Sequence, residues 1–181
     1  MTKKEQAYYI RLIEDAQKLF KLSLAVHIAC SSKKKNVFKY LDSFTYYNHS
    51  ATHDELYLEP AEEERAAAAF AHCAIYTMVV QLDTVLGCVF SDRFHHPDTD
   101  ICSAAWISRL LRNAFAHNPL NPVWQIYSEC DNKMYKVKKI ITLETKGING
   151  VRVTRKHYGG PLSILKLSEF IKREISSVAA T

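Results

Sequence analysis

Three polar residues in the middle of the chain have side chains that can move protons and bind phosphate. Arg112, Asn113 and His117 lie within the run RNAFAHNP at residues 112–119. A neutral histidine can accept the proton of a ribose 2′-hydroxyl, because imidazole ordinarily titrates near neutral pH. An arginine can bind a phosphate with two parallel hydrogen bonds, and an asparagine can orient either group. These residue types can cleave RNA without a metal, leaving a 2′,3′-cyclic phosphate and a 5′-hydroxyl.

The surrounding sequence predicts that this run ends a helix. We expect the helix to extend from about residue 100 to residue 117 or 118. Asp98 or Thr99 can cap its start. The sequence Asn118-Pro119 stops it, because the residue before a proline avoids the helical conformation.

A helical projection separates the polar residues from the apolar ones. Arg109, Arg112, Asn113 and His117 fall along one side. The opposite side carries apolar residues, namely Ile107, Leu110, Leu111, Ala114 and Phe115. On an ideal helix Arg112 and His117 diverge by about 140°. The two side chains therefore meet at one site only if the helix end frays or a second subunit contributes. By spacing alone, helix capping or simple exposure to solvent is the commoner role for such a pair.

The run RNAFAHN at residues 112–118 resembles the R-N-x-x-x-H form of the R-x(4–6)-H signature of the HEPN superfamily (higher eukaryotes and prokaryotes nucleotide-binding domains). The similarity covers roughly residues 3–118, where two long predicted helices match the family's core pair. The later stretch is also similar to the tail of compact stand-alone prokaryotic members. It contains Trp124, Asn149-Gly150 and the sequence HYGG at residues 157–160.

This resemblance implies an all-α bundle in which two copies of the motif face each other across a homodimer. Many members are metal-independent ribonucleases, including toxins, phage-defence proteins and effector nucleases of RNA-guided systems. The resemblance implies catalytic roles for Arg112 and His117, with Asn113 as their polar neighbour. Toxins paired with a nucleotidyltransferase antitoxin usually have tyrosine two residues after the histidine. That position is Pro119 here, so we expect no silencing by tyrosine modification there.

A second pair, Arg65 and His72, also fits the looser spacing of the signature. The two residues share a face of a helix predicted from residue 60 to about residue 90. This pair lacks the asparagine and the helix-ending proline. We therefore expect His72 to be a buried or interface residue.

Metal-ligand residue types gather in one loop, at His95, His96, Asp98 and Asp100. They have no matching H-x-x-H pattern or carboxylate partner, so a solvated capping loop is the favoured interpretation. The sequence also contains no Walker loop and no G-x-G-x-x-G fingerprint. We expect neither a metal nor a cofactor.

Basic residues indicate where RNA would lie. We predict RNA contacts at Arg109, Lys136, Lys138 and Arg155. The last three belong to a larger basic cluster with Lys139, Arg152, Lys156 and His157, and another basic run lies at residues 33–35. Apart from Arg109, which shares a side of the helix with the motif, RNA contact and the solvated face of a sheet account for these residues equally well.

The whole sequence predicts a mainly α fold: an HEPN-type helical bundle with a small antiparallel β appendage and a C-terminal helix. Further helices are expected at residues 3–30, 37–44 and 162–175, with a polar loop through residue 59. Short strands are expected at residues 123–127, 134–137, 140–145 and 151–153. We interpret residues 1–181 as one domain, divided into a helical core at 3–118, a β appendage at 119–160 and the C-terminal helix at 161–177.

Composition agrees with a soluble cytoplasmic protein. The chain has 181 residues, of which 48% are hydrophobic, and a formal charge of +5 that permits a polyanionic partner. Its five cysteines are scattered without a C-x-x-C pair, which argues against disulfides and structural zinc. The apolar stretch at residues 66–86 is broken by His72, Gln81 and Asp83, so we expect a core helix and no membrane span.

These observations lead to one principal expectation and two alternatives. The first is a homodimeric endoribonuclease that needs no metal and acts as a toxin or phage-defence effector, with an antitoxin or regulatory partner. The second is a non-catalytic HEPN module that binds RNA, a nucleotide or a protein partner. The third is a helical scaffold in which the motif is accidental, which predicts a monomer without affinity for RNA.

Overall fold

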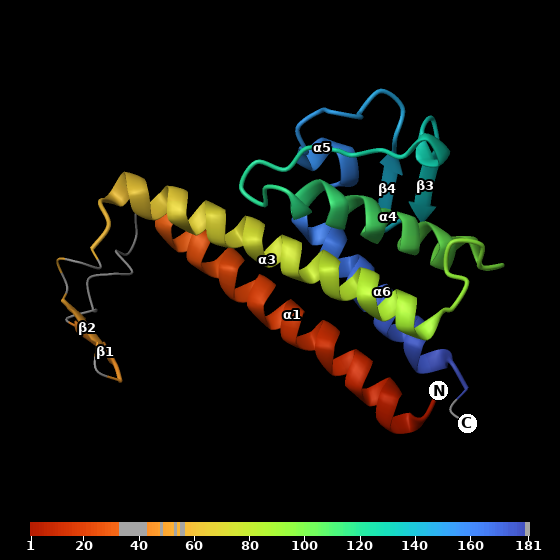
Figure 1. Cartoon of the computed structure of the whole chain (residues 1–181), viewed down its shortest axis with the longest axis horizontal. Helices are drawn as coiled ribbons and strands as arrows, with labels where there is room; N and C mark the ends of the chain where they lie inside the picture. The colour runs from red at the N-terminus through yellow and green to blue at the C-terminus, as the bar shows by residue number, and fades with distance from the viewer. Residues whose placement is uncertain (33–42, 48, 53, 55–56, 180–181) are drawn as a thin grey trace. The chain divides into compact units, whose positions relative to one another are not determined.

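The computed structural model describes residues 1–32, 43–47, 49–52, 54 and 57–179 (Figure 1). The long helices are α1 (Lys3–Ser31), α3 (Pro60–Val89), α4 (Thr99–Ala116) and α6 (Pro161–Ser177), and a short helix is α5 (Arg155–Tyr158). The strands are β1 (Ser43–Tyr46), β2 (His49–Thr52), β3 (Met134–Val137) and β4 (Ile141–Glu144). The prediction of a mainly α fold with a small antiparallel β part and a C-terminal helix is confirmed. That the bundle is of the HEPN type stays a prediction.

The chain forms two compact units. The first consists of Met1–Phe20 and His72–Thr181, and the second of Lys21–Ala71. Helices α1 and α3 each contribute residues to both units. The prediction of a single domain over residues 1–181 stays a prediction.

The second unit contains a β-hairpin where the sequence predicted a polar loop. Strands β1 and β2 pair antiparallel, from Ser43 opposite Thr52 to Tyr46 opposite His49. The prediction was wrong here because Phe44-Thr45-Tyr46 has the aromatic and β-branched residues of a strand, which the polar residues around them obscured. The helix predicted at residues 37–44 lies outside the described residues except for its last two, which belong to β1. The basic run at residues 33–35 lies outside them entirely.

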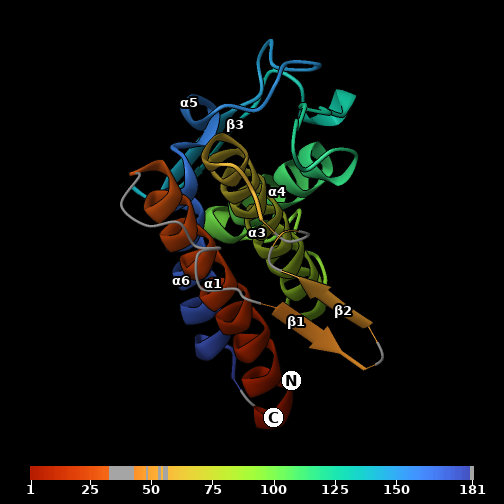
Figure 2. The ribbon, with the colours of Figure 1, turned by 90° about the vertical axis from the view of Figure 1, so that its left-hand side faces the viewer.

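Four helical segments enclose the core of the first unit. Their buried apolar residues include Ile13, Phe20, Met78, Leu82, Leu110, Leu111, Phe170 and Ile171. Helix α6 lies beside the first part of α1, as Figure 2 shows. Gln17 Nε2 donates a buried hydrogen bond to Ser168 Oγ at 2.7 Å, and Gln6 Nε2 donates to the carbonyl of Ile175 at 2.7 Å. These contacts bring the start of α1 and the end of α6 together.

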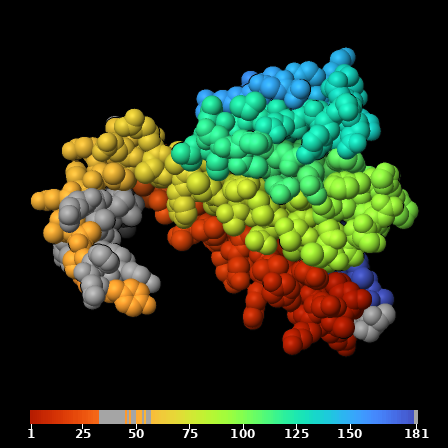
Figure 3. Space-filling model, in the orientation of Figure 1, coloured from red at the N-terminus to blue at the C-terminus, as the bar shows by residue number. Residues whose placement is uncertain are grey.

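The β3–β4 hairpin packs against α4. Its register runs from Met134 opposite Glu144 to Val137 opposite Ile141, and inward residues alternate with exposed ones. Residues after α4, coloured blue-green and light blue, gather on the side of the first unit opposite the red N-terminal residues (Figure 3). Helix α4 thus packs against the β3–β4 hairpin on one side and forms ion pairs with α3 on another.

The strand predicted at residues 123–127 is absent. Only Val123 forms a β-bridge there, with Arg152. Backbone hydrogen bonds pair residues 122–124 with residues 150–153. Beyond them the side chain of Asn149 accepts the hydrogen bond from the Ile126 backbone N–H at 3.0 Å. At Ile126 a side-chain contact thus follows where the backbone pairing ends.

Helix α3 is long and apolar enough to cross a membrane, and it is the one such helix among the described residues. Half of its most apolar 18-residue window is buried inside the protein. The core helix of a soluble protein has the same properties, so this feature is weak support for a membrane span.

Candidate functional site

Helix α4 carries the motif and begins and ends as its sequence predicts. Of the two predicted capping residues, the structure selects Asp98, whose side chain accepts hydrogen bonds from the N–H groups of Asp100 and Ile101. His117 is the C-terminal cap. The predicted two-sided pattern is also present: the five apolar residues are at most 2% exposed, whereas Arg109, Arg112 and Asn113 are partly exposed and His117 is exposed.

An arginine cluster surrounds a buried carboxylate on α3. Asp83 Oδ1 lies 3.1 Å from Arg93 Nη2 and 3.2 Å from Arg109 Nε, and its Oδ2 lies 3.8 Å from Arg112 Nε. The Asp83 side chain is only 6% exposed. Asp83 thereby ties both arginines of the motif helix to α3. We call Asp83, Arg93, Arg109 and Arg112 the arginine cluster.

Arg93 is the buried member of the arginine cluster. Its Nη1 also donates to the backbone carbonyl of Asp83, and its guanidinium passes over Gly87, where a Cβ atom would overlap it. Glycine at this position therefore lets the guanidinium lie against the helix backbone. Burial lowers the pKa of Arg93, Asp83 partly offsets this effect, and the positive charges of Arg109 and Arg112 lower it further.

Aromatic rings support the arginine cluster from the loop before α4. The ring centroid of Phe94 lies 4.8 Å from Arg93 Cζ and 5.7 Å from Arg109 Cζ. The ring of Trp106, on α4, contacts Phe94 at a centroid distance of 4.3 Å. The ring of Tyr135, on β3, contacts Trp106 at a centroid distance of 5.9 Å. Because cations are attracted to aromatic faces, Phe94 holds both guanidiniums in place.

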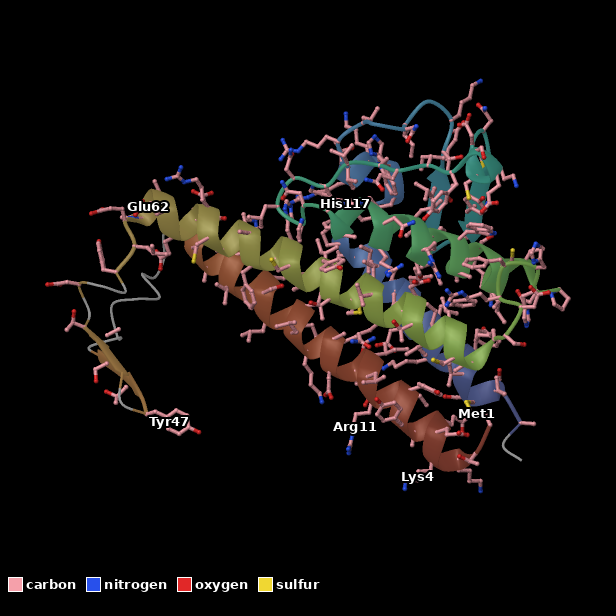
Figure 4. All side chains as sticks on the ribbon, viewed as in Figure 1. Met1, Lys4, Arg11, Tyr47, Glu62 and His117 are labelled. Carbon is pink, nitrogen blue, oxygen red and sulfur yellow. The ribbon has the colours of Figure 1, made fainter. Side chains whose placement is uncertain are left out.

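Asn113 and His117 face different surroundings from Arg112. Asn113 Nδ2 donates to the hydroxyl of Tyr127 at 2.7 Å. His117 lies at the C-terminal end of α4 (Figure 4), and no hydrogen bond or ion pair engages it within the described part of the chain. Its neighbour Asn118 folds the chain back by accepting hydrogen bonds from the N–H groups of Leu120 and Asn121. The imidazole is therefore left accessible at the edge of this turn.

The structure thus brings together only part of the predicted site. Arg109 and Arg112 share Asp83, whereas Asn113 contacts Tyr127 and His117 contacts neither arginine. The divergence predicted from the helix geometry persists in the folded chain, because the end of α4 does not fray.

The other predicted RNA contacts lie in separate places. Lys136 is exposed on the outer side of β3. Lys138 lies 4.0 Å from Asp100 Oδ2, 3.9 Å from Glu174 Oε1 and 4.9 Å from the centroid of Phe170. These contacts join the β3–β4 turn to α4 and α6, and an RNA contact at Lys138 stays a prediction. Arg155 is exposed, and the structure gives it no contact with the arginine cluster.

Both residues of the competing motif pair lie on α3. Arg65 belongs to the second unit and is exposed, whereas His72 belongs to the first unit and is partly buried. The His72 ring meets the edge of Phe115 at a centroid distance of 6.3 Å. His72 thus packs against the apolar side of α4.

The loop before α4 uses its acidic and histidine side chains locally. His95 Nδ1 pairs with Asp92 Oδ1 at 3.0 Å, and His96 Nδ1 accepts a hydrogen bond from the backbone N–H of Asp98 at 3.1 Å. Asp100 Oδ1 accepts one from the backbone N–H of Lys138 at 3.0 Å. The first two contacts stay within the loop, whereas Asp100, in the first turn of α4, binds the turn between β3 and β4.

A histidine anchors the segment that follows α4. Trp124 Nε1 donates to His157 Nδ1 at 2.8 Å, and the backbone N–H of Thr154 donates to the same nitrogen at 3.2 Å. A nitrogen that accepts these bonds carries no proton, so the ring is neutral with its proton on Nε2. Burial lowers the pKa of His157.

Acidification from about pH 8 to about pH 5 is expected to destabilise the fold through His157. Because its pKa is lowered in the folded state, the unfolded chain takes up the proton first. The stabilisation is present above the ordinary histidine pKa of about 6.5 and is lost as the pH falls through that value towards the lowered one. Thermal unfolding measured across this range should show a falling Tm.

Two glutamine variants separate His157 from other histidines. His157→Gln keeps an acceptor but cannot titrate, so its Tm should depend less on pH. His95→Gln, at a side chain that is 81% exposed, should keep the full dependence. An unchanged pH dependence in His157→Gln would contradict the assignment.

Sequence reasoning missed Asp83, Arg93 and Tyr127. Asp83 interrupts an apolar stretch at residues 66–86, and a single acidic residue on a buried helix face is itself a signal that a cation lies opposite. Arg93 and Tyr127 gave no comparable signal, because only the folded chain brings them near α4.

The first unit is therefore a small helical bundle with a β-hairpin, and its most charged partly buried site lies between α3 and α4. Comparisons of the chain with protein-family models, with curated proteins and with solved structures found no match.

Proposed function

We propose that this protein is a metal-independent endoribonuclease of the HEPN superfamily, acting in the cytoplasm as a toxin or phage-defence effector. The proposal is carried by the polar side of α4, where Arg112, Asn113 and His117 stay accessible at the end of a helix whose opposite side is buried. Arg112 approaches Asp83 with its Nε at 3.8 Å, so its terminal amino groups remain for a phosphate. His117 has an accessible imidazole.

The reaction would be a transesterification. A neutral His117 accepts the proton of the 2′-hydroxyl, and the 2′-oxygen forms a bond to phosphorus. The bond from phosphorus to the 5′-oxygen breaks, and the same His117, protonated in the first half of the reaction, returns the proton to that oxygen. Arg112 stabilises the charge on the phosphoryl oxygens, and Asn113, held by Tyr127, orients the imidazole or an oxygen. The products are a 2′,3′-cyclic phosphate and a 5′-hydroxyl.

A homodimer would complete this site. Within one chain Arg112 turns towards Asp83 on α3, whereas His117 caps the end of α4. A two-fold axis near the end of α4 would place the His117 of each subunit opposite the Arg112 of the other. An antitoxin or other regulatory partner would then act by covering this composite site.

Cleavage in the presence of EDTA tests the proposal. Wild-type protein should cleave RNA, leave the corresponding DNA intact and yield 2′,3′-cyclic phosphate ends. His117→Ala and Arg112→Ala should each lower kcat/KM by at least about 10²-fold. His95→Ala is the matched control, because His95 is exposed and lies outside the motif. Undiminished cleavage by both motif variants would overturn the assignment.

A second candidate function is binding of RNA or a nucleotide without cleavage, and the arginine cluster supports it. Three arginines around one carboxylate attract an anion whether or not a reaction follows. A non-catalytic HEPN module would bind RNA or a nucleotide and leave it intact. RNA that is bound tightly by wild-type protein but recovered at full length would support this second function.

A further inference from the structure

The arginine cluster carries more positive charge than the protein neutralises. Arg93, Arg109 and Arg112 approach Asp83, and within the described part of the chain none of the three forms an ion pair with a second carboxylate. Arginine stays protonated in proteins. Three positive charges therefore face one negative charge, and two remain. A surplus of this kind in a partly buried place attracts anions.

Two of the three arginines are able to serve an external anion. Arg93 is buried and bonded to both the carboxylate and the carbonyl of Asp83. The side chains of Arg109 and Arg112 are 30% and 40% exposed, and both meet Asp83 through Nε. A guanidinium has five N–H donors, so the terminal amino groups of both arginines remain for another acceptor. Within the described residues, no side chain or backbone carbonyl accepts a hydrogen bond from these terminal amino groups.

The position of Arg109 along α4 sets which phosphate it can reach. Arg109 precedes Arg112 by three residues, and side chains with this spacing lie on neighbouring turns with Cβ atoms roughly 5–6 Å apart. His117 lies in the opposite direction from Arg112. In the proposed composite site the scissile phosphate lies at Arg112, beside the His117 of the other subunit. An RNA strand that continues from there towards the start of α4 passes Arg109 next.

We propose that Arg109 forms a second phosphate site, which binds the phosphate adjacent to the scissile one in the RNA substrate. This inference rests on the proposed function, which places the scissile phosphate at Arg112. Asp83 fixes the Nε edge of Arg109 and Phe94 supports its guanidinium, so the terminal amino groups are oriented before the substrate arrives. A guanidinium oriented in this way can bind a phosphate with two parallel hydrogen bonds.

Short chimeric oligonucleotides test this site. Each carries one ribonucleotide in a 2′-deoxy chain with randomised bases, so cleavage occurs at one phosphate only. The dinucleotide has that phosphate alone, and two trinucleotides add a phosphate on its 5′ or its 3′ side. Wild-type kcat/KM should be about tenfold higher for one trinucleotide than for the dinucleotide, because a charged hydrogen-bonded contact is gained.

The Arg109→Gln variant should lose this preference. Its kcat/KM for the favoured trinucleotide should fall about tenfold, and that for the dinucleotide much less. Its Tm should not fall, because Asp83 keeps two arginines. Arg173→Gln removes the same charge at an exposed position on α6 and should keep the preference. An equal loss for both substrates, or a falling Tm, would show a structural role and overturn the proposal.

Failure of the proposed function is recognisable in the same design. If wild-type protein cleaves neither RNA nor any of these oligonucleotides, the nuclease assignment fails. Binding of uncleavable all-deoxy oligonucleotides then still tests the second phosphate site. Fluorescence anisotropy at low salt should then show tighter binding of the trinucleotide than of the dinucleotide, and Arg109→Gln should abolish the difference. No difference in wild type, or one that persists in Arg109→Gln, overturns the site.

Discussion

Mixed dimers of two inactive variants, His117→Ala and Arg112→Ala, are expected to cleave RNA. If Arg112 of one subunit works with His117 of the other, such a dimer keeps one intact pair of two. Random exchange of subunits makes half of the dimers mixed, so the mixture should recover about a quarter of the wild-type rate. Each variant alone should lie at least about 10²-fold below wild type. The recovery is measured as initial rates of cleavage after the subunits have exchanged.

A reciprocal mixture is the control. Dimers of wild-type protein with the double variant Arg112→Ala/His117→Ala keep one pair within a subunit but no pair across the interface. These dimers, isolated with two different affinity tags, should be inactive. If they cleave RNA while the dimers of single variants do not, each subunit carries its own site and the composite site is refuted. A protein that stays monomeric at the assay concentration would refute it as well.

Replacing Asp83 by leucine is expected to have the largest effect on stability. The guanidinium of Arg93 would remain buried without its counter-ion, and removing one partner of a buried ion pair typically costs about 3–5 kcal/mol. Arg109 and Arg112 can turn towards solvent, because their side chains are partly exposed. The free energy of unfolding, measured with urea, should therefore fall by about this amount.

A second substitution shows whether the buried charge is the cause. Asp83→Leu combined with Arg93→Met removes both charges and should recover most of the lost stability, because apolar residues of similar size can replace a buried ion pair. Asp92→Leu, at a side chain that is 75% exposed, is the control and should change stability by less than about 0.5 kcal/mol. A double variant as unstable as Asp83→Leu alone would contradict the explanation.

Local sequence rules predicted the long helices closely. Asp98 caps α4, and Asn118-Pro119 ends it after Ala116, because these residues act on the backbone beside them. The same rules placed α3 at Pro60–Val89 and α6 at Pro161–Ser177 within a few residues. They failed at residues 123–127, where the backbone pairing ends at Trp124 and the side chain of Asn149, distant in sequence, binds the backbone of Ile126. They also failed at the β1–β2 hairpin, because its four-residue strands are too short to show a clear alternation of apolar and polar residues.

The sequence by itself determined which side of α4 is polar, because helical periodicity places Arg109, Arg112, Asn113 and His117 together whatever the rest of the fold. Only the tertiary structure decided what those side chains contact. Asp83 lies 26 residues before Arg109, and Tyr127 lies 14 residues after Asn113. No local pattern encodes such pairs, since they depend on how α3 and the segment after α4 pack. That packing brings Arg109 and Arg112 to Asp83 and leaves two positive charges for an anion.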